Sequence, residues 1–220
     1  MKNSNNPYKE GKMRFSFKVL FILSLSVFLI TGSFYPVGAQ EEKVRAKIGI
    51  QIKSGDRIMR AKSQDRLKAG DLLRIYVHPE KTSHVYVVHT DLREATLLNM
   101  VEQKIQSSTV VMPSLQEFYQ VDGKSQKETF TIIISPDELP EALDVLGTGN
   151  APYSKWAEIE EVLLEKSKID LSQKTEKPFA ISGNVRGAVG SDDVDPFVGK
   201  LQIFSGKSIL IKRYEFRVKK

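Results

Sequence analysis

The sequence predicts a mainly β fold, either an antiparallel β-sandwich or a partly open barrel, with one inserted amphipathic helix at about residues 152–168. Three observations predict this class. Residues 45–54 (RAKIGIQIKS) alternate apolar and polar side chains, as a half-buried strand does. Short strand-like segments recur along the chain with turn residues between them. One later segment, PYSKWAEIEEVLLEKSK, has helical periodicity instead.

The first 39 residues are predicted to be a signal peptide, which leaves residues 40–220 as a single exported β-rich domain. Basic residues precede an uncharged apolar run at 19–32, and VGA at 37–39 ends in the small-residue pattern that signal peptidase cleaves. We expect cleavage after Ala39 and a location in the periplasm or outside the cell. The alternative is a retained anchor, but the run is shorter than the roughly 20 residues that span a bilayer. No membrane span is therefore expected after cleavage.

Composition excludes several kinds of function. Removing residues 1–39 takes away five of the 33 basic and one of the 27 acidic residues, which leaves a net charge of +2. The sequence shows no clustered basic stretch in the remainder, so we expect no nucleic-acid partner. The chain has no cysteine, which excludes disulfides, thiol nucleophiles and cysteine-based zinc sites.

The first elements are predicted to be hairpins. A turn at 54–56 joins the strand at 45–54 to a return strand at 57–61, and another turn follows at 68–71. Two strands at 72–78 and 84–90 flank a five-residue connection, and pairing His78 with His84 gives one consistent register. In that register Leu73, Ile75, Val77, Val85 and Val87 share the core face with His89. The opposite face carries Arg74, Tyr76, His78, His84, Tyr86 and Val88.

The later elements are short strands, helices and one long loop. Strands are expected at 95–100 and 109–112, followed by a second hairpin across 117–135. Ser135-Pro136-Asp137-Glu138 resembles a helix start, so a short helix is expected from there to about Gly147. The helix at 152–168 carries an apolar stripe formed by Trp156, Ile159, Val162 and Leu163, with Glu160 and Glu161 on its solvent face. A loop at 172–196, with a short strand at 178–182, precedes a last hairpin around Ser205-Gly206, whose final strand turns Leu210, Tyr214, Phe216 and Val218 to the core.

Residues 67–91 (LKAGDLLRIYVHPEKTSHVYVVHTD) resemble the core motif of the bacterial domain-of-unknown-function 4384 family. The matching features are a Gly-Asp turn at Gly70-Asp71, an alternating strand, and a second strand that contains Tyr86 and ends at Asp91. Residues 112–139 resemble the second half of the motif, with Pro113, a turn at Gly123 and a Ser-Pro exit. The resemblance covers roughly 66–140 and is weaker toward the C-terminus; LLNMVEQ at 97–103 departs from the aromatic-Pro-Asn segment that members carry. It implies an extracytoplasmic or accessory β domain and supplies no catalytic residues.

The three histidines are the first chemical candidates, because all lie within residues 78–89. His78 and His84 can meet across the predicted hairpin, with Glu80 as a third ligand, but a catalytic zinc usually has three protein ligands and a water. Two solvated imidazoles at a hairpin end explain the spacing without a site. We therefore expect no metal and no cofactor.

Two further sets of residues are candidates for binding. Asp192, Asp193 and Asp195 form an acidic run that suits calcium in residue type but lacks the spacing of an EF-hand. Arg186, in a neighbouring glycine-rich stretch, is a candidate anion contact. Tyr76 and Tyr86 share the second face of the predicted hairpin and need cover, either from the helix at 152–168 or from a partner protein.

Three functions follow in order of preference. The first is a non-catalytic exported β domain that acts through contacts with an unknown protein of the cell envelope. The second is a small-ligand or ion-binding module that uses the loop at 182–196. The third is an envelope hydrolase, which requires a polar pocket that joins His89 to a Ser and an Asp.

Overall fold

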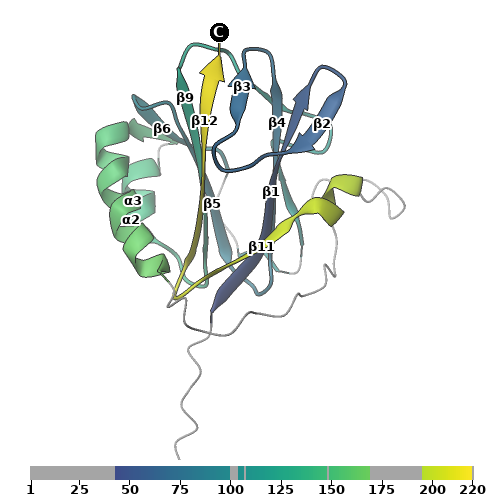
Figure 1. Ribbon diagram of the computed structural model, residues 1–220. Coiled ribbons are helices and arrows are strands. Elements are labelled where there is room, and N and C mark those ends of the chain that lie inside the picture. Colours follow the sequence, from purple (N-terminus) through teal and green to yellow (C-terminus); the bar gives the residue numbers. More distant parts are fainter. Residues whose placement is uncertain (1–42, 100–103, 107, 148, 169–194, 220) are drawn as a thin grey trace, which may run out of the picture. The chain divides into compact units, whose positions relative to one another are not determined.

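The computed structural model describes residues 43–99, 104–106, 108–147, 149–168 and 195–219, and it confirms a mainly β fold with two packed sheets (Figure 1). Sheet A has the order β11 (Gln202–Gly206), β1 (Val44–Ser54), β4 (Leu72–Pro79), β7 (Val110–Met112), with β2 (Arg57–Arg60) paired to β1 and β8 (Tyr119–Gln120) paired to β4. Sheet B has the order β10 (Asn150–Pro152), β6 (Glu94–Leu97), β5 (His84–Thr90), β9 (Lys127–Ser135), β12 (Leu210–Lys219), β3 (Arg66–Lys68). Among the strands of the described residues, the β12–β3 pair alone is parallel. The sheets do not close into a barrel, so the sandwich prediction is confirmed.

The main core lies between the sheets, on the faces that sequence alternation predicts. Ala46, Ile48 and Ile50 of β1 are fully buried, because every second residue of the strand points inward. The predicted core residues of β4, β5 and β12 are also buried and pack in the same core: Leu73, Ile75, Val77, Val85, Val87, Leu210, Tyr214, Phe216, Val218.

Helices and a 3-10 turn cover the outer faces of the two sheets. The helices α2 (Pro140–Leu146) and α3 (Tyr153–Ser167) pack on sheet B over Tyr86, Val88 and Ile133 (Figure 1). On sheet A, the 3-10 turn η1 (Pro196–Lys200) places Phe197 and Val198 over Tyr76. In the described part of the chain, no helix has the length and apolar character needed to cross a membrane.

The strand partners differ from the prediction at three of the four expected hairpins. β4 pairs with β1 along one edge and with β7 and β8 along the other, which leaves no edge for β5. β5 therefore belongs to sheet B, and so do β9 and β12, whose predicted partners β8 and β11 are in sheet A. A connection of four residues can span the roughly 10 Å between packed sheets. The first hairpin, β1–β2, is confirmed, with Gly55 at the turn in a positive-φ conformation (56°).

The helices also differ in detail from the prediction. α3 confirms the helix at 152–168, but Val162 is exposed and Glu160, expected on the solvent face, is buried. β9 continues to Ser135 and α2 begins only at Pro140, so the predicted helix start was wrong, although the helix ends at Leu146, next to Gly147 as expected. The predicted strand at 178–182 lies outside the described residues.

Candidate functional site

A cavity of about 350 Å³ opens between the two sheets at one end of the sandwich. Its walls come from the start of β4, the end of β5, the start of β9 and the segment around β8. These strand ends lie together because neighbouring strands are antiparallel. β4 begins beside the end of β1, and β9 begins beside the end of β5. The C-terminal end of β12 lies at the same end of the sandwich, at the top of Figure 1. Residue Val44, where β1 starts, therefore lies at the opposite end.

A histidine and a glutamate on the wall of this cavity face each other. His89 lies opposite Phe130 in the β5–β9 register, and Glu128 lies two residues earlier on the same face of β9. The Nε2 atom of His89 is 2.5 Å from Oε2 of Glu128, and the two side chains are 29% and 10% exposed. The imidazole ring also packs on Phe130, with 5.0 Å between ring centroids. The pair is thus held by a hydrogen bond on one side and an aromatic ring on the other.

The remaining lining is apolar inside and charged at the rim. Leu73, Leu98, Val121 and Phe130 form the apolar surface, and burial raises the pKa of Tyr119 beside them. Apolar walls combined with polar groups that can orient a ligand are typical of a binding pocket. The volume lies near the lower end of the range of about 300–1,000 Å³ for ligand sites, which suits one large side chain or a small molecule.

Two ion pairs form the rim. Arg93 donates to Asp91 from Nη2 at 2.8 Å and from Nε at 3.1 Å. Burial opposes ionisation of Asp91, but the backbone N–H groups of Glu94 and Arg93 and the Arg93 guanidinium outweigh it and lower the pKa of Asp91 to about 2. In the second pair, Lys124 donates to Asp122 from its backbone nitrogen, and its Nζ lies 3.1 Å from the carboxylate; these contacts lower the pKa of Asp122. Both charge signs are therefore available to a ligand at the rim.

The cavity brings a histidine, a serine and carboxylates together, as the hydrolase hypothesis requires, but their hydrogen bonds serve other roles. The Ser125 hydroxyl donates to the carbonyl oxygen of Lys127 at 2.7 Å and to that of Asp91 at 3.3 Å. His89 is bound to Glu128 through Nε2. A nucleophilic serine must instead present its hydroxyl to the base. In this arrangement the Ser125 hydroxyl is directed to backbone carbonyl oxygens and not to His89.

The histidines at 78 and 84 are separated, because their strands belong to different sheets. His78 is buried and its Nδ1 lies 3.1 Å from Oγ1 of Thr109; burial, and then the charge of Lys47, lower its pKa. His84 lies opposite Ser135 on β9. Glu80, the third suggested ligand, accepts from Nη1 of Arg45 at 3.1 Å. Over the ranges that the structure describes, no three His, Asp or Glu side chains are grouped to hold a metal ion.

The two tyrosines suggested as an interaction surface are buried under the chain itself, on different sheets. Tyr86 lies under α2 and its hydroxyl accepts from the backbone N–H of Leu139 at 2.9 Å. Tyr76 lies under η1 and packs on Phe197, with 4.9 Å between ring centroids. The predicted cross-strand pair is therefore wrong, because the two strands belong to different sheets, and the chain itself covers both rings instead of a partner protein.

Asp195, the last residue of the predicted acidic run, caps the start of η1 and binds it to sheet A. Its carboxylate accepts from the Tyr76 hydroxyl and from the backbone N–H of Phe197, and lies 3.5 Å from Nη1 of Arg74. The Arg74 guanidinium in turn stacks 3.8 Å from the ring centroid of Phe118. These contacts satisfy the carboxylate within the fold. Arg186, Asp192 and Asp193 lie outside the described residues, and their suggested role stays a prediction.

Comparison of the chain with models of known families, with curated proteins and with solved structures finds no match. The assignment of a function therefore depends on the cavity and on the sequence.

Sequence reasoning placed His89 near the end of the core face but missed its partner. Glu128 has the same parity as Phe130 and Ile132, so a charged residue at a core-facing position of β9 was the available signal. The cavity itself could not be predicted from the amino-acid sequence, because its walls come from strands whose pairing was predicted incorrectly.

Proposed function

We propose that this protein is a non-catalytic, exported β-sandwich that binds a partner protein of the cell envelope through the cavity at the end of the sandwich. The observation that carries the proposal is the apolar cavity with the His89–Glu128 pair inside it and two ion pairs at its rim. Protein interfaces have the same anatomy, with an apolar anchor pocket surrounded by a polar rim. The secretion pattern at 1–39 and the resemblance of residues 66–140 to an extracytoplasmic family support the location.

The chemistry of the cavity also indicates what enters it. An anchor side chain with an apolar stem would pack on Leu98, Val121 and Phe130. A donor at its tip, as in arginine, lysine or tyrosine, would reach the Glu128 carboxylate, whose Oε2 already accepts from His89. Because Glu128 is only 10% exposed, a donor there forms its bond away from competing water.

Site-specific photocrosslinking in the native envelope tests this proposal. A photoreactive residue at Gln120, which lines the cavity, is expected to give a discrete protein adduct. The same residue at Ile58, which is 50% exposed on β2 and lies outside the cavity, serves as the control and should give none. Leu98→Trp, which fills the cavity, should remove the adduct without lowering the thermal midpoint.

The outcomes separate the partner from a small ligand. Absence of a reproducible adduct from Gln120 contradicts the protein-partner proposal. The cavity volume equally fits a small amine with an apolar body. Binding of such an amine to the purified protein, lost in Glu128→Gln, would then favour the ligand-binding alternative.

A further inference from the structure

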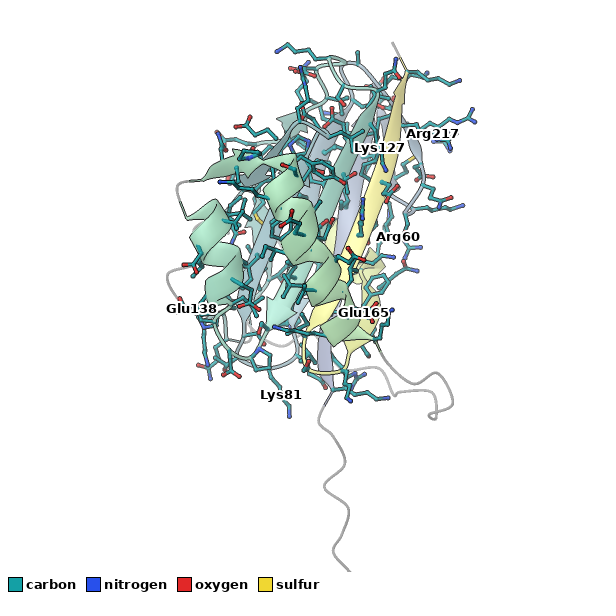
Figure 2. All side chains as sticks on the ribbon, turned by 90° about the vertical axis from the view of Figure 1, so that its left-hand side faces the viewer. Arg60, Lys81, Lys127, Glu138, Glu165 and Arg217 are labelled. Atoms are coloured by element: carbon teal, nitrogen blue, oxygen red, sulfur yellow. The ribbon has the colours of Figure 1, made fainter. Side chains whose placement is uncertain are left out.

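A second cavity, of about 410 Å³, lies beside the exposed edge of sheet B and is rich in positive charge. It is lined by Gln64, Arg66, Lys127, Glu215, Phe216 and Arg217. Lys127 and Glu128 are consecutive on β9, so their side chains point to opposite faces of the sheet. The two cavities therefore open at the same end of the sandwich but on different faces. Figure 2 shows Lys127 and Arg217 close together on the face beside α3.

The register of sheet B places three cations of this cavity in one row. Arg217 of β12 lies opposite Arg66 of β3 on one side and opposite Lys127 of β9 on the other. The next row of the β12–β3 pair holds Lys219 opposite Lys68. Like charges directly opposite each other destabilise a sheet. Such a row persists most readily where an anion offsets the repulsion.

Carboxylates neutralise only part of this charge. Lys127 Nζ is 2.8 Å from Oε2 of Glu215, and Nε of Arg213 is 3.0 Å from Oε1 of the same residue. Arg213 is also paired with Glu160 at 3.4 Å, so Lys127 and Arg213 are balanced by two carboxylates.

The two remaining arginines have no such partner. Within the described residues neither Arg66 nor Arg217 forms an ion pair, and both are exposed. Two adjacent guanidinium groups present planar forks of N–H donors, which match the oxygens of phosphate in bidentate geometry. The amide of Gln64, in the same lining, adds further donors.

We propose that Arg66 and Arg217 form a binding site for a dianionic phosphate group, either free phosphate or a phosphomonoester. The charge balance selects this ligand, because the two uncompensated positive charges match a group that carries about −2 at pH 7. A carboxylate or a phosphodiester carries only one negative charge and is expected to bind more weakly. The site is independent of the cavity that contains His89 and Glu128.

Titration of the purified protein with inorganic phosphate and with phenyl phosphate, followed by ¹H–¹⁵N NMR at constant ionic strength, tests the site. We expect a dissociation constant of about 1 mM or lower, with shifts at the Arg66 and Arg217 amide and Nε–H signals. Arg66→Gln/Arg217→Gln should weaken binding at least tenfold. The control Lys81→Gln/Lys104→Gln removes the same charge at the other end of the sandwich, where Lys81 lies in Figure 2, and should bind as the wild type does.

Two further arms identify the ligand. Tighter binding of phenyl phosphate assigns the site to an organic monoester, and equal binding assigns it to free phosphate; both support the proposal. Binding should weaken between pH 7.5 and pH 5, because the second pKa of phosphate is near 6. Glu215, which also lines the cavity, stays ionised over this range, since the hydrogen bond from Lys127 lowers its pKa.

Three results would overturn the inference. One is the absence of shifts at about 10 mM phosphate, ten times the expected dissociation constant. Another is equal binding by the wild type and the double arginine variant. The third is equal affinity for dimethyl phosphate, a monoanionic diester, which would show that the charge match does not select the ligand.

Discussion

The contact between α3 and sheet B depends on one buried carboxylate, and this gives a sharp stability prediction. Glu160 is 4% exposed. Its Oε1 accepts from the Thr131 hydroxyl at 2.5 Å, and its Oε2 lies 3.4 Å from Nη1 of Arg213. Glu160→Ala removes the acceptor of a buried hydroxyl and one partner of an ion pair.

The magnitude follows from these contacts. A hydrogen bond to a charged group contributes about 1.5–3 kcal/mol, and removing one partner of a fully buried ion pair costs about 3–5 kcal/mol. Arg213 is 27% exposed and keeps its contact with Glu215, so the cost falls below that range. We expect Glu160→Ala to lower the free energy of unfolding by about 2–3 kcal/mol, which corresponds to roughly 5–10 °C in the thermal midpoint of a domain of this size.

Urea denaturation and thermal melting, both followed by circular dichroism, measure the effect. Glu161→Ala is the matched control, because it changes the same residue type at the next, exposed position of α3 and should stay within about 0.5 kcal/mol of the wild type. Glu160→Gln, which keeps the shape and loses the charge, should lie between the two. Equal stability of the two alanine variants would refute the reasoning, since it would mean that the buried carboxylate contributes nothing net.

Three further predictions concern single contacts. Tyr86→Phe leaves the buried N–H of Leu139 without its acceptor and should cost about 1–3 kcal/mol in a urea melt. Gly206→Ala should cost roughly 3 kcal/mol, because its Cβ would lie 1.8 Å from a backbone carbonyl oxygen, whereas Gly199→Ala, with open space around it, should be near neutral. Asp91 has a folded-state pKa of about 2 against an ordinary 3.8, so its stabilising effect is complete above pH 4 and is lost as the pH falls toward 2. Asp91→Asn should therefore be about 1 kcal/mol less stable than the wild type at pH 7, after allowance for solvent screening, and most of this difference should be gone near pH 2.

The orientation of side chains was predictable from the sequence, and the pairing of strands was not. Alternation in β1, β4 and β5 assigned Ile48, Ile75 and Val87 to the core, and each is fully buried. The same alternation is satisfied whether a strand pairs with its neighbour in sequence or crosses to the other sheet. The hairpin of β4 with β5 was therefore consistent with every residue, and yet the edges of β4 are occupied by β1, β7 and β8.

At the candidate site, too, the direction of a side chain was predictable and its partner was not. His89 could be placed at the end of the core face, but its partner Glu128 lies 39 positions away on a strand predicted to pair elsewhere. Helical periodicity predicted the buried side chains of α3 less well than alternation predicted those of the strands. Val162 was expected in the apolar stripe but is exposed, and Glu160 was expected on the solvent face but is buried. A buried carboxylate needs a hydrogen-bonding partner from another element, and Arg213 of β12 cannot be assigned from the helix alone.

The β class, the helix at 153–167, the face of each long strand and the absence of cysteine chemistry could be predicted from the amino-acid sequence, because they depend on local periodicity and composition. The pairing of the strands, the burial of the two tyrosines, and the contacts of His89 with Glu128 and of Arg66 with Arg217 became visible in the folded chain. These last features depend on contacts between distant segments, and a period of two along a strand specifies a face without specifying the neighbour.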